Sequence, residues 1–178
     1  VRDLCQAHGI AADELRDTPL VAASWCGASD FTERYYRDLI SSGIDLANPM
    51  LFAESVPNIG SAQASIALGI QAASISVVGR RTAGLEALFL AKARIASGEW
   101  QRAIVVAAEE EHPLVTRVLR HCCGEPITTS TAAVALLLER GRSTDHGTSV
   151  GSVGHAPHGV TPCDGRTRIT AVRGHTAT

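Results

Sequence analysis

Short runs of apolar residues along this chain alternate with longer stretches in which apolar residues recur at the spacing of a helix. Residues 18–26, 103–108 and 131–138 are almost entirely apolar, which is typical of strands covered on both faces of a sheet. Residues 74–78 (SISVV) predict a shorter strand. Because Gly, Pro or a polar turn bounds each run, the chain is expected to form several buried strands.

The clearest predicted helix begins at Asp30. An acceptor side chain at Asp30 and Glu33 three positions later give a capping-box pattern. Phe31, Tyr35 and Leu39 then repeat every four residues, which sets them on one helical face. Further helices are predicted over residues 1–9, 60–70 and 82–96. A loop is predicted to begin at residue 48, and residues 109–131 contain a polar segment. The order of strand, turn, helix and strand favours an α/β fold.

Composition narrows the class of protein. The chain has 178 residues, 45% of them hydrophobic, and 16 basic against 18 acidic side chains. These values fit one globular domain or a piece of one, and they argue against a disordered chain. A near-neutral balance without a basic cluster gives no footprint for nucleic acid or an anionic membrane surface. The apolar runs are shorter than a membrane span.

Cysteine usage and the start of the chain predict a cytoplasmic protein. Five cysteines are an odd number, and their spacing fits neither a disulfide framework nor a C-x-x-C motif. Reduced thiols are therefore expected. The chain opens without a charged and then apolar leader, so the sequence predicts no export signal.

Three short patterns could carry chemistry, and each has a simpler explanation. Residues 147–151 (GTSVG) match a serine nucleophile elbow but lack the flanking strand and helix. Cys122-Cys123 beside His121 are sequence neighbours, which seldom face one another productively. The polar C-terminal region holds potential metal ligands whose spacing fits no common zinc frame, namely His155, His158, Cys163, Asp164 and His175. We expect no metal and no cofactor.

Four blocks of the sequence have the form of conserved motifs of a known family. They are residues 48–58 (NPMLFAESVPN), 84–98 with its Gly-Leu-x-Ala-Leu start, 103–109 (AIVVAAE) and 132–139. Together they resemble the β-ketoacyl synthase, or condensing enzyme, family of fatty acid and polyketide synthesis. The resemblance implies a truncated thiolase-like fold with a mixed sheet covered by helices on both faces. Residues 1–165 would be the N-terminal half domain, and 166–178 a tail of unassigned structure.

The family's nucleophilic cysteine falls on Arg81, with Gly79-Arg80 before it. A guanidinium stays protonated at neutral pH and cannot form an acyl thioester. The two catalytic histidines of the family belong to its second half, which has no counterpart here. The resemblance therefore implies a subunit without condensing activity of its own.

Chain length factors are members of this family that pair with an active ketosynthase in type II polyketide systems, and 78–88 (VGRRTAGLEAL) resembles them. The resemblance implies a heterodimer, with the acyl carrier protein an indirect partner. The side chains implied at the partner's acyl tunnel are Leu51, Ser55, Cys26, Phe31 and Tyr35. The strand implied to pair across the interface is Ser74, Ile75, Ser76, Val77 and Val78.

Two alternatives stay open from the sequence. Arg81 or Arg80 could hold a malonyl carboxylate in a decarboxylase or an acyltransferase, because charge-assisted hydrogen bonds from arginine suit a carboxylate. The chain could also be a remnant that only self-associates. Whichever function holds, a half fold whose strands are apolar on both faces is expected to leave an apolar patch exposed. A patch of this kind needs a binding partner to cover it.

Overall fold

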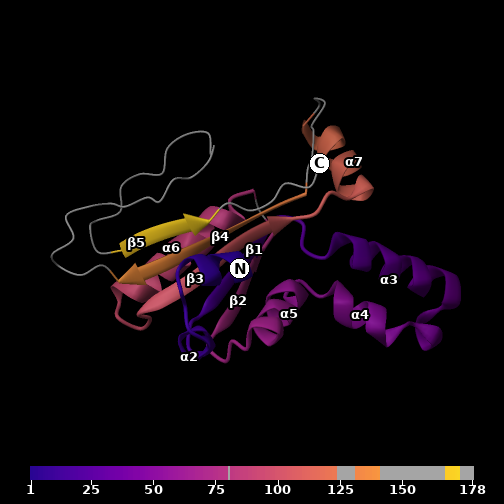
Figure 1. The fold of residues 1–178 in the computed structure, drawn as a ribbon. Coiled ribbons are helices and arrows are strands. Elements are labelled where there is room, and N and C mark those ends of the chain that lie inside the picture. Colours follow the sequence, from indigo (N-terminus) through magenta and orange to yellow (C-terminus); the bar gives the residue numbers. More distant parts are fainter. Residues whose placement is uncertain (80, 124–130, 141–166, 173–178) are drawn as a thin grey trace.

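A computed structural model describes residues 1–79, 81–123, 131–140 and 167–172 (Figure 1). One mixed sheet runs in the order β2-β1-β3-β4-β5. Strand β1 pairs in parallel with β2 and β3, whereas β4 is antiparallel to β3 and β5. The strands are β1 (Leu20–Ser24), β2 (Ser74–Val78), β3 (Arg102–Glu109), β4 (Ala132–Arg140) and β5 (Thr167–Val172).

Helices lie on both faces of this sheet. Helix α6 covers one face, and α1, α2 and α5 lie toward the other (Figure 1). The remaining helices sit beyond the ends of the strands. The helices are α1 (Arg2–Ala7), α2 (Ala12–Arg16), α3 (Ser29–Ser42), the 3-10 helix η1 (Ile44–Leu46), α4 (Pro49–Ser55), α5 (Ile59–Leu68), α6 (Ala83–Ala96) and α7 (Pro113–Cys123).

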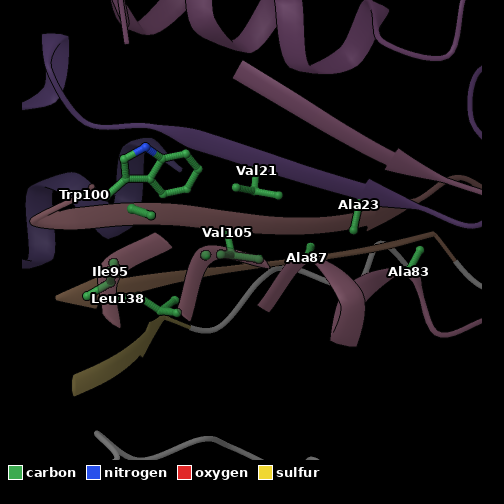
Figure 2. Close-up of a cluster of buried hydrophobic side chains, with 10 residues drawn as sticks. Val21, Ala23, Ala83, Ala87, Ile95, Trp100, Val105 and Leu138 are labelled. Atoms are coloured by element: carbon green, nitrogen blue, oxygen red, sulfur yellow. The ribbon is translucent and has the colours of Figure 1, made fainter. Parts of the chain in front are cut away.

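The core between α6 and the sheet is built on small side chains. Ala83, Ala87 and Ala91 recur every four residues on the buried face of α6, and Ala87 has no exposed surface. Alanines at this spacing let the helix lie close to the strands, where Val21 and Val105 face it (Figure 2). The alanines thus set the buried face of α6, whereas its large apolar residues Leu85 and Phe89 are 58% and 69% exposed.

Alternation along the strands supplies the second core. Leu20 and Ile104 point away from α6, while their neighbours Val21 and Val105 point toward it. Leu20 and Ile104 pack with Leu4 and Leu15 from the N-terminal helices. Wholly apolar strands are explained by these two cores, so the predicted cover on both faces is confirmed.

The structure corrects the predicted start of the first long helix. Helix α3 begins at Ser29, and its N-cap is Ala28 with no side-chain cap. Asp30 lies in the first turn, with a carboxylate oxygen 3.4 Å from Nη1 of Arg34, and Glu33 accepts from Arg37. The capping-box interpretation was wrong because both carboxylates are used by other partners.

Two segments predicted as irregular are helical. Residues 49–55 form α4, in which the Asn48 side chain accepts from the N–H groups of Met50 and Leu51 and Pro49 occupies the first turn. This is a helix start signal that the loop prediction overlooked. Within the polar segment 109–131, residues 113–123 form α7.

Strand β5 lies in the range that the sequence analysis left without structure. It pairs with β4 from Ala135 to Arg140. The domain boundary at residue 165 stays a prediction. The possible nucleophile elbow at 147–151 falls outside the described residues, as do His155, His158, Cys163, Asp164 and His175.

Candidate functional site

The parallel strands β2, β1 and β3 end at the same edge of the sheet, and Glu109 organises that edge. Its carboxylate accepts hydrogen bonds from the backbone N–H of Trp25 and, at 3.3 Å, from the hydroxyl of Ser24. The Ser24 hydroxyl in turn accepts from the N–H of Gly27 at 2.8 Å. Gly27 has a φ of +60°, which favours glycine. Glu109 thus fixes the turn from which the chain enters α3.

Arg81, at the position implied for the nucleophile, immediately precedes α6. Its guanidinium carbon lies 5.3 Å from the centroid of the Trp25 ring, a cation–π arrangement. The side chain implied to replace the nucleophile therefore faces the turn that Glu109 holds. Arg80 lies outside the described residues.

Cys26 is a half-buried free thiol in the same turn. Burial raises the pKa of the Cys26 thiol, and the carboxylate of Glu109 raises this pKa further because a thiolate beside it would be a second negative charge. A raised pKa lowers the thiolate fraction at neutral pH. The environment of Cys26 therefore disfavours nucleophilic chemistry there.

We expect Cys26 to react with iodoacetamide several-fold more slowly in the folded protein at pH 7.5 than in urea, where the thiol recovers its ordinary pKa. The rate should rise as pH increases through the raised pKa. Glu109→Gln should restore part of the rate, since it removes the carboxylate charge but not the burial. Peptide-resolved mass spectrometry separates Cys26 from the other cysteines. Equal rates in the folded and unfolded chain would contradict this description of the site.

The implied tunnel residues gather on a projection formed by α3, η1 and α4, which we call the arm (residues 29–55; Figure 1). Phe31 and Tyr35 lie on α3, Leu51 and Ser55 on α4, and Cys26 precedes the arm. The hydroxyl of Thr32 donates to the Ser55 carbonyl at 3.2 Å. The structure thus brings all five implied residues to one part of the molecule.

Apolar side chains are unusually exposed on the arm. Every residue of the arm is at least partly exposed, and Ile40 is 83% exposed. Exposure of several large apolar side chains on one segment is more typical of an interface than of a monomer surface. The large exposed apolar residues of the arm are Tyr36, Ile40, Ile44, Leu46, Met50 and Phe52.

Strand β2, implied as the pairing strand, is one edge of the described sheet. The N–H of Leu20 donates to the carbonyl of Ala73, and the N–H of Gly79 donates to the carbonyl of Ser24. Backbone groups of alternate residues point to opposite sides of a strand. The backbone groups of Ser74, Ser76 and Val78 therefore point toward the open edge.

Two hydroxyl pairs hold this edge strand against α5. Ser61 and Ser76 share a hydrogen bond of 2.7 Å, and Ser65 donates to Ser74 at 3.1 Å. Ser61 and Ser65 are buried. These two serines of α5 thus fix the position of β2 through its side chains and not through its outward backbone groups.

Comparison with known proteins identifies the family. The model of the β-ketoacyl synthase N-terminal domain matches residues 1–123. The chain belongs to the β-ketoacyl synthase family. No curated protein sequence matches it significantly. The recognition made from the blocks at 48–58 and 103–109 is confirmed.

Solved structures confirm the thiolase-like fold. The ketosynthase ApeO in complex with its chain length factor ApeC, from Xenorhabdus doucetiae, matches with a TM-score of 0.62 and 24% identity, over 80% of this chain and 54% of that one. The ishigamide ketosynthase/chain length factor gives 0.66 and 19%, and a β-ketoacyl synthase from Burkholderia phymatum gives 0.62 and 18%; each match covers 76% of this chain and 38% of the other. The chain thus spans about two-fifths to a half of these structures.

The described residues contain neither a metal-binding cluster nor a membrane-spanning helix. They hold no cluster of three or more His, Cys, Asp or Glu side chains arranged to bind a metal. No helix in this part of the chain is long and apolar enough to cross a bilayer. His121 is exposed near the end of α7.

Sequence reasoning missed one cluster, around His112. The sequence analysis interpreted Asp30 and Glu33 as a helix cap, but it did not connect them with the distant His112. Nothing in the local pattern connects the two segments, because their contact depends on the turn after β3. The only available signal was the polar interruption that follows β3.

Proposed function

We propose that this chain is a non-catalytic subunit of the chain length factor type. It pairs with an active ketosynthase in type II polyketide or related fatty acid-like biosynthesis and shapes the acyl tunnel of its partner. The observation that carries the proposal is Arg81, a cation at the position where the family resemblance implies the nucleophile. A guanidinium cannot take up an acyl group as a thioester.

The apolar surface of the arm supports the need for a partner. Burial of side chains such as Ile40 and Phe52 would stabilise a complex by about 25 cal/mol for each Å² removed from water. The open edge of β2 offers backbone donors and acceptors to a strand from the partner. Apolar contacts would give such an interface its affinity, and strand pairing would fix its register.

In this proposal the arm reaches the far end of the partner's tunnel. Leu51 and Ser55 would limit the volume there, with Phe31, Tyr35 and Cys26 beside them. Growth of the acyl chain would stop when its end meets these side chains. The acyl carrier protein would deliver substrate to the ketosynthase and meet this subunit only indirectly. We expect the pair to act in the cytoplasm.

Native mass spectrometry of the chain, alone and expressed together with the ketosynthase encoded beside it, tests the proposal. We expect a stable one-to-one complex and an aggregated or poorly soluble chain when the partner is absent, because the apolar arm would then be uncovered. A homodimer that ignores the ketosynthase would overturn the proposal and favour a self-associating remnant. Release of carbon dioxide from malonyl-carrier protein by the isolated chain would favour a decarboxylase that uses Arg81.

A further inference from the structure

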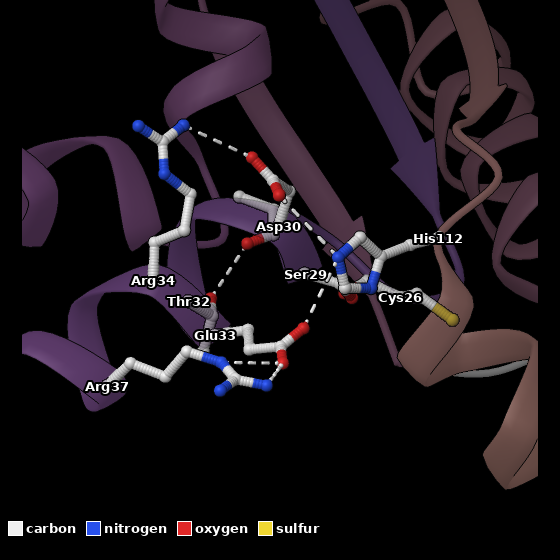
Figure 3. Close-up of polar contacts among 9 residues, drawn as sticks. Cys26, Ser29, Asp30, Thr32, Glu33, Arg34, Arg37 and His112 are labelled. Carbon is white, nitrogen blue, oxygen red and sulfur yellow. Dashed lines mark hydrogen bonds and ion pairs between the residues drawn. The ribbon is translucent and has the colours of Figure 1, made fainter.

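A network of charged side chains surrounds His112 at the base of the arm (Figure 3). Its Nε2 lies 3.5 Å from Oδ1 of Asp30 and 3.4 Å from Oε2 of Glu33. Each carboxylate also meets an arginine one helical turn later, Arg34 and Arg37 respectively. Among these five side chains, four belong to α3 and only His112 comes from another element.

His112 is anchored outside the arm on both sides. Its backbone carbonyl accepts the N–H of Thr116 at 3.0 Å, which begins α7. The N–H of the preceding residue, Glu111, donates to the hydroxyl of Thr131 at 3.0 Å, just before β4. The imidazole therefore reaches the arm from a position fixed by the sheet and by α7.

The arm itself has mainly internal contacts. Helix α3 packs chiefly on α4 and η1. The rings of Tyr35 and Phe52 lie 5.5 Å apart, and the N–H of Asn48 donates to Asp38 at 3.1 Å. These contacts hold α3 and α4 together, and at the other end of the arm Gln63 of α5 donates to Glu54 at 2.9 Å. His112 fixes the end where α3 begins, through Asp30 and Glu33.

The contact between His112 and Glu33 is more shielded from solvent than an ordinary surface contact. The His112 side chain is only 13% exposed, and that of Glu33 is 23% exposed. Nδ1 of His112 is buried and has no hydrogen-bond partner among the described residues. Since an unsatisfied buried nitrogen costs free energy, the two carboxylate contacts at Nε2 must offset that cost for the ring to stay in place.

We infer that His112 is a positioning residue that ties the arm to the sheet through Asp30 and Glu33. The consequence for product length rests on the proposed function, because the arm carries Leu51 and Ser55. If the arm moved relative to the sheet, these side chains would move with it and the end of the partner's tunnel would be less sharply defined.

Hydrogen–deuterium exchange of the full chain tests the inference directly, in the reconstituted pair or, where no pair forms, in the chain alone at a concentration that keeps it in solution. His112→Leu keeps a side chain of similar size but replaces the imidazole nitrogens with apolar groups. We expect the amides of α3 and α4 to exchange about fivefold faster in this variant, while β1, β3 and α6 keep their rates. His112→Gln, whose amide can still donate to a carboxylate, should restore most of the protection.

A matched control and a second variant complete the test. His121→Leu changes an exposed histidine of α7 and should leave the arm unchanged. Asp30→Ala with Glu33→Ala removes both acceptors from the side of α3 and should reproduce the His112→Leu pattern, so the test does not depend on one variant folding. In the pair, His112→Leu should broaden the product-length distribution and His112→Gln should narrow it again.

The outcomes separate this inference from the proposed function. Unchanged exchange in the arm, or uniformly faster exchange throughout the chain, would overturn the role of His112 as a positioning residue. A wild-type chain that forms no complex with a ketosynthase would overturn the proposed function. Faster exchange confined to the arm of the His112→Leu variant would still support His112 as the positioning residue.

Discussion

Ser76→Pro is expected to weaken the complex with the ketosynthase by about 100-fold or more, because proline removes a backbone donor from the open edge of β2. The N–H of Ser76 points away from β1, so the pairing of β2 within this chain should survive. Proline is tolerated at such outward positions of an edge strand. The interface should therefore be lost while the fold is kept.

Ser76→Ala is the matched control for this prediction. It removes the hydroxyl that bonds to Ser61 but keeps the backbone N–H. We expect a modest loss of stability, about 1 kcal/mol, and little change in affinity for the ketosynthase. Native mass spectrometry and a titration would measure complex formation, and circular dichroism would check the fold. A Ser76→Pro chain that still binds with wild-type affinity would exclude β2 as the pairing strand.

Leu51→Ala is expected to lengthen the main product of a reconstituted pair by about one two-carbon unit, since it removes volume at the proposed end of the tunnel. Leu51→Trp should shorten the product for the opposite reason. Leu51 is half-buried on α4, on the same arm as Ser55 and Tyr35. Mass spectrometry of the released products measures both changes.

Met50→Ala provides the control on the same helix. Met50 is 69% exposed, so its loss removes a comparable volume from the outer surface of the arm. We expect this variant to affect the affinity of the pair at most, and not the length of its product. An unchanged length distribution in both Leu51 variants would remove Leu51 from the proposed tunnel.

Local patterns were reliable where short-range physics controls the outcome. The strand at 74–78 is β2, and the helix predicted over 82–96 is α6 with one residue fewer at its start. Both predictions rested on the types and order of neighbouring residues, which short-range preferences control directly. The missed helix α4 also had a local signal, Asn48 followed by Pro49, which the loop interpretation passed over.

The amino-acid sequence by itself determined the family, the α/β class and the arginine at the position that the family resemblance implies for the nucleophile. These depend on which residues are present and on their order. Tertiary structure alone decided that β2 lies at an edge of the described sheet, that α3 and α4 form an exposed arm, and that His112 meets Asp30 and Glu33. The physical reason is that strand order and the contact of distant segments depend on how the whole chain buries its apolar surface, which no local spacing encodes.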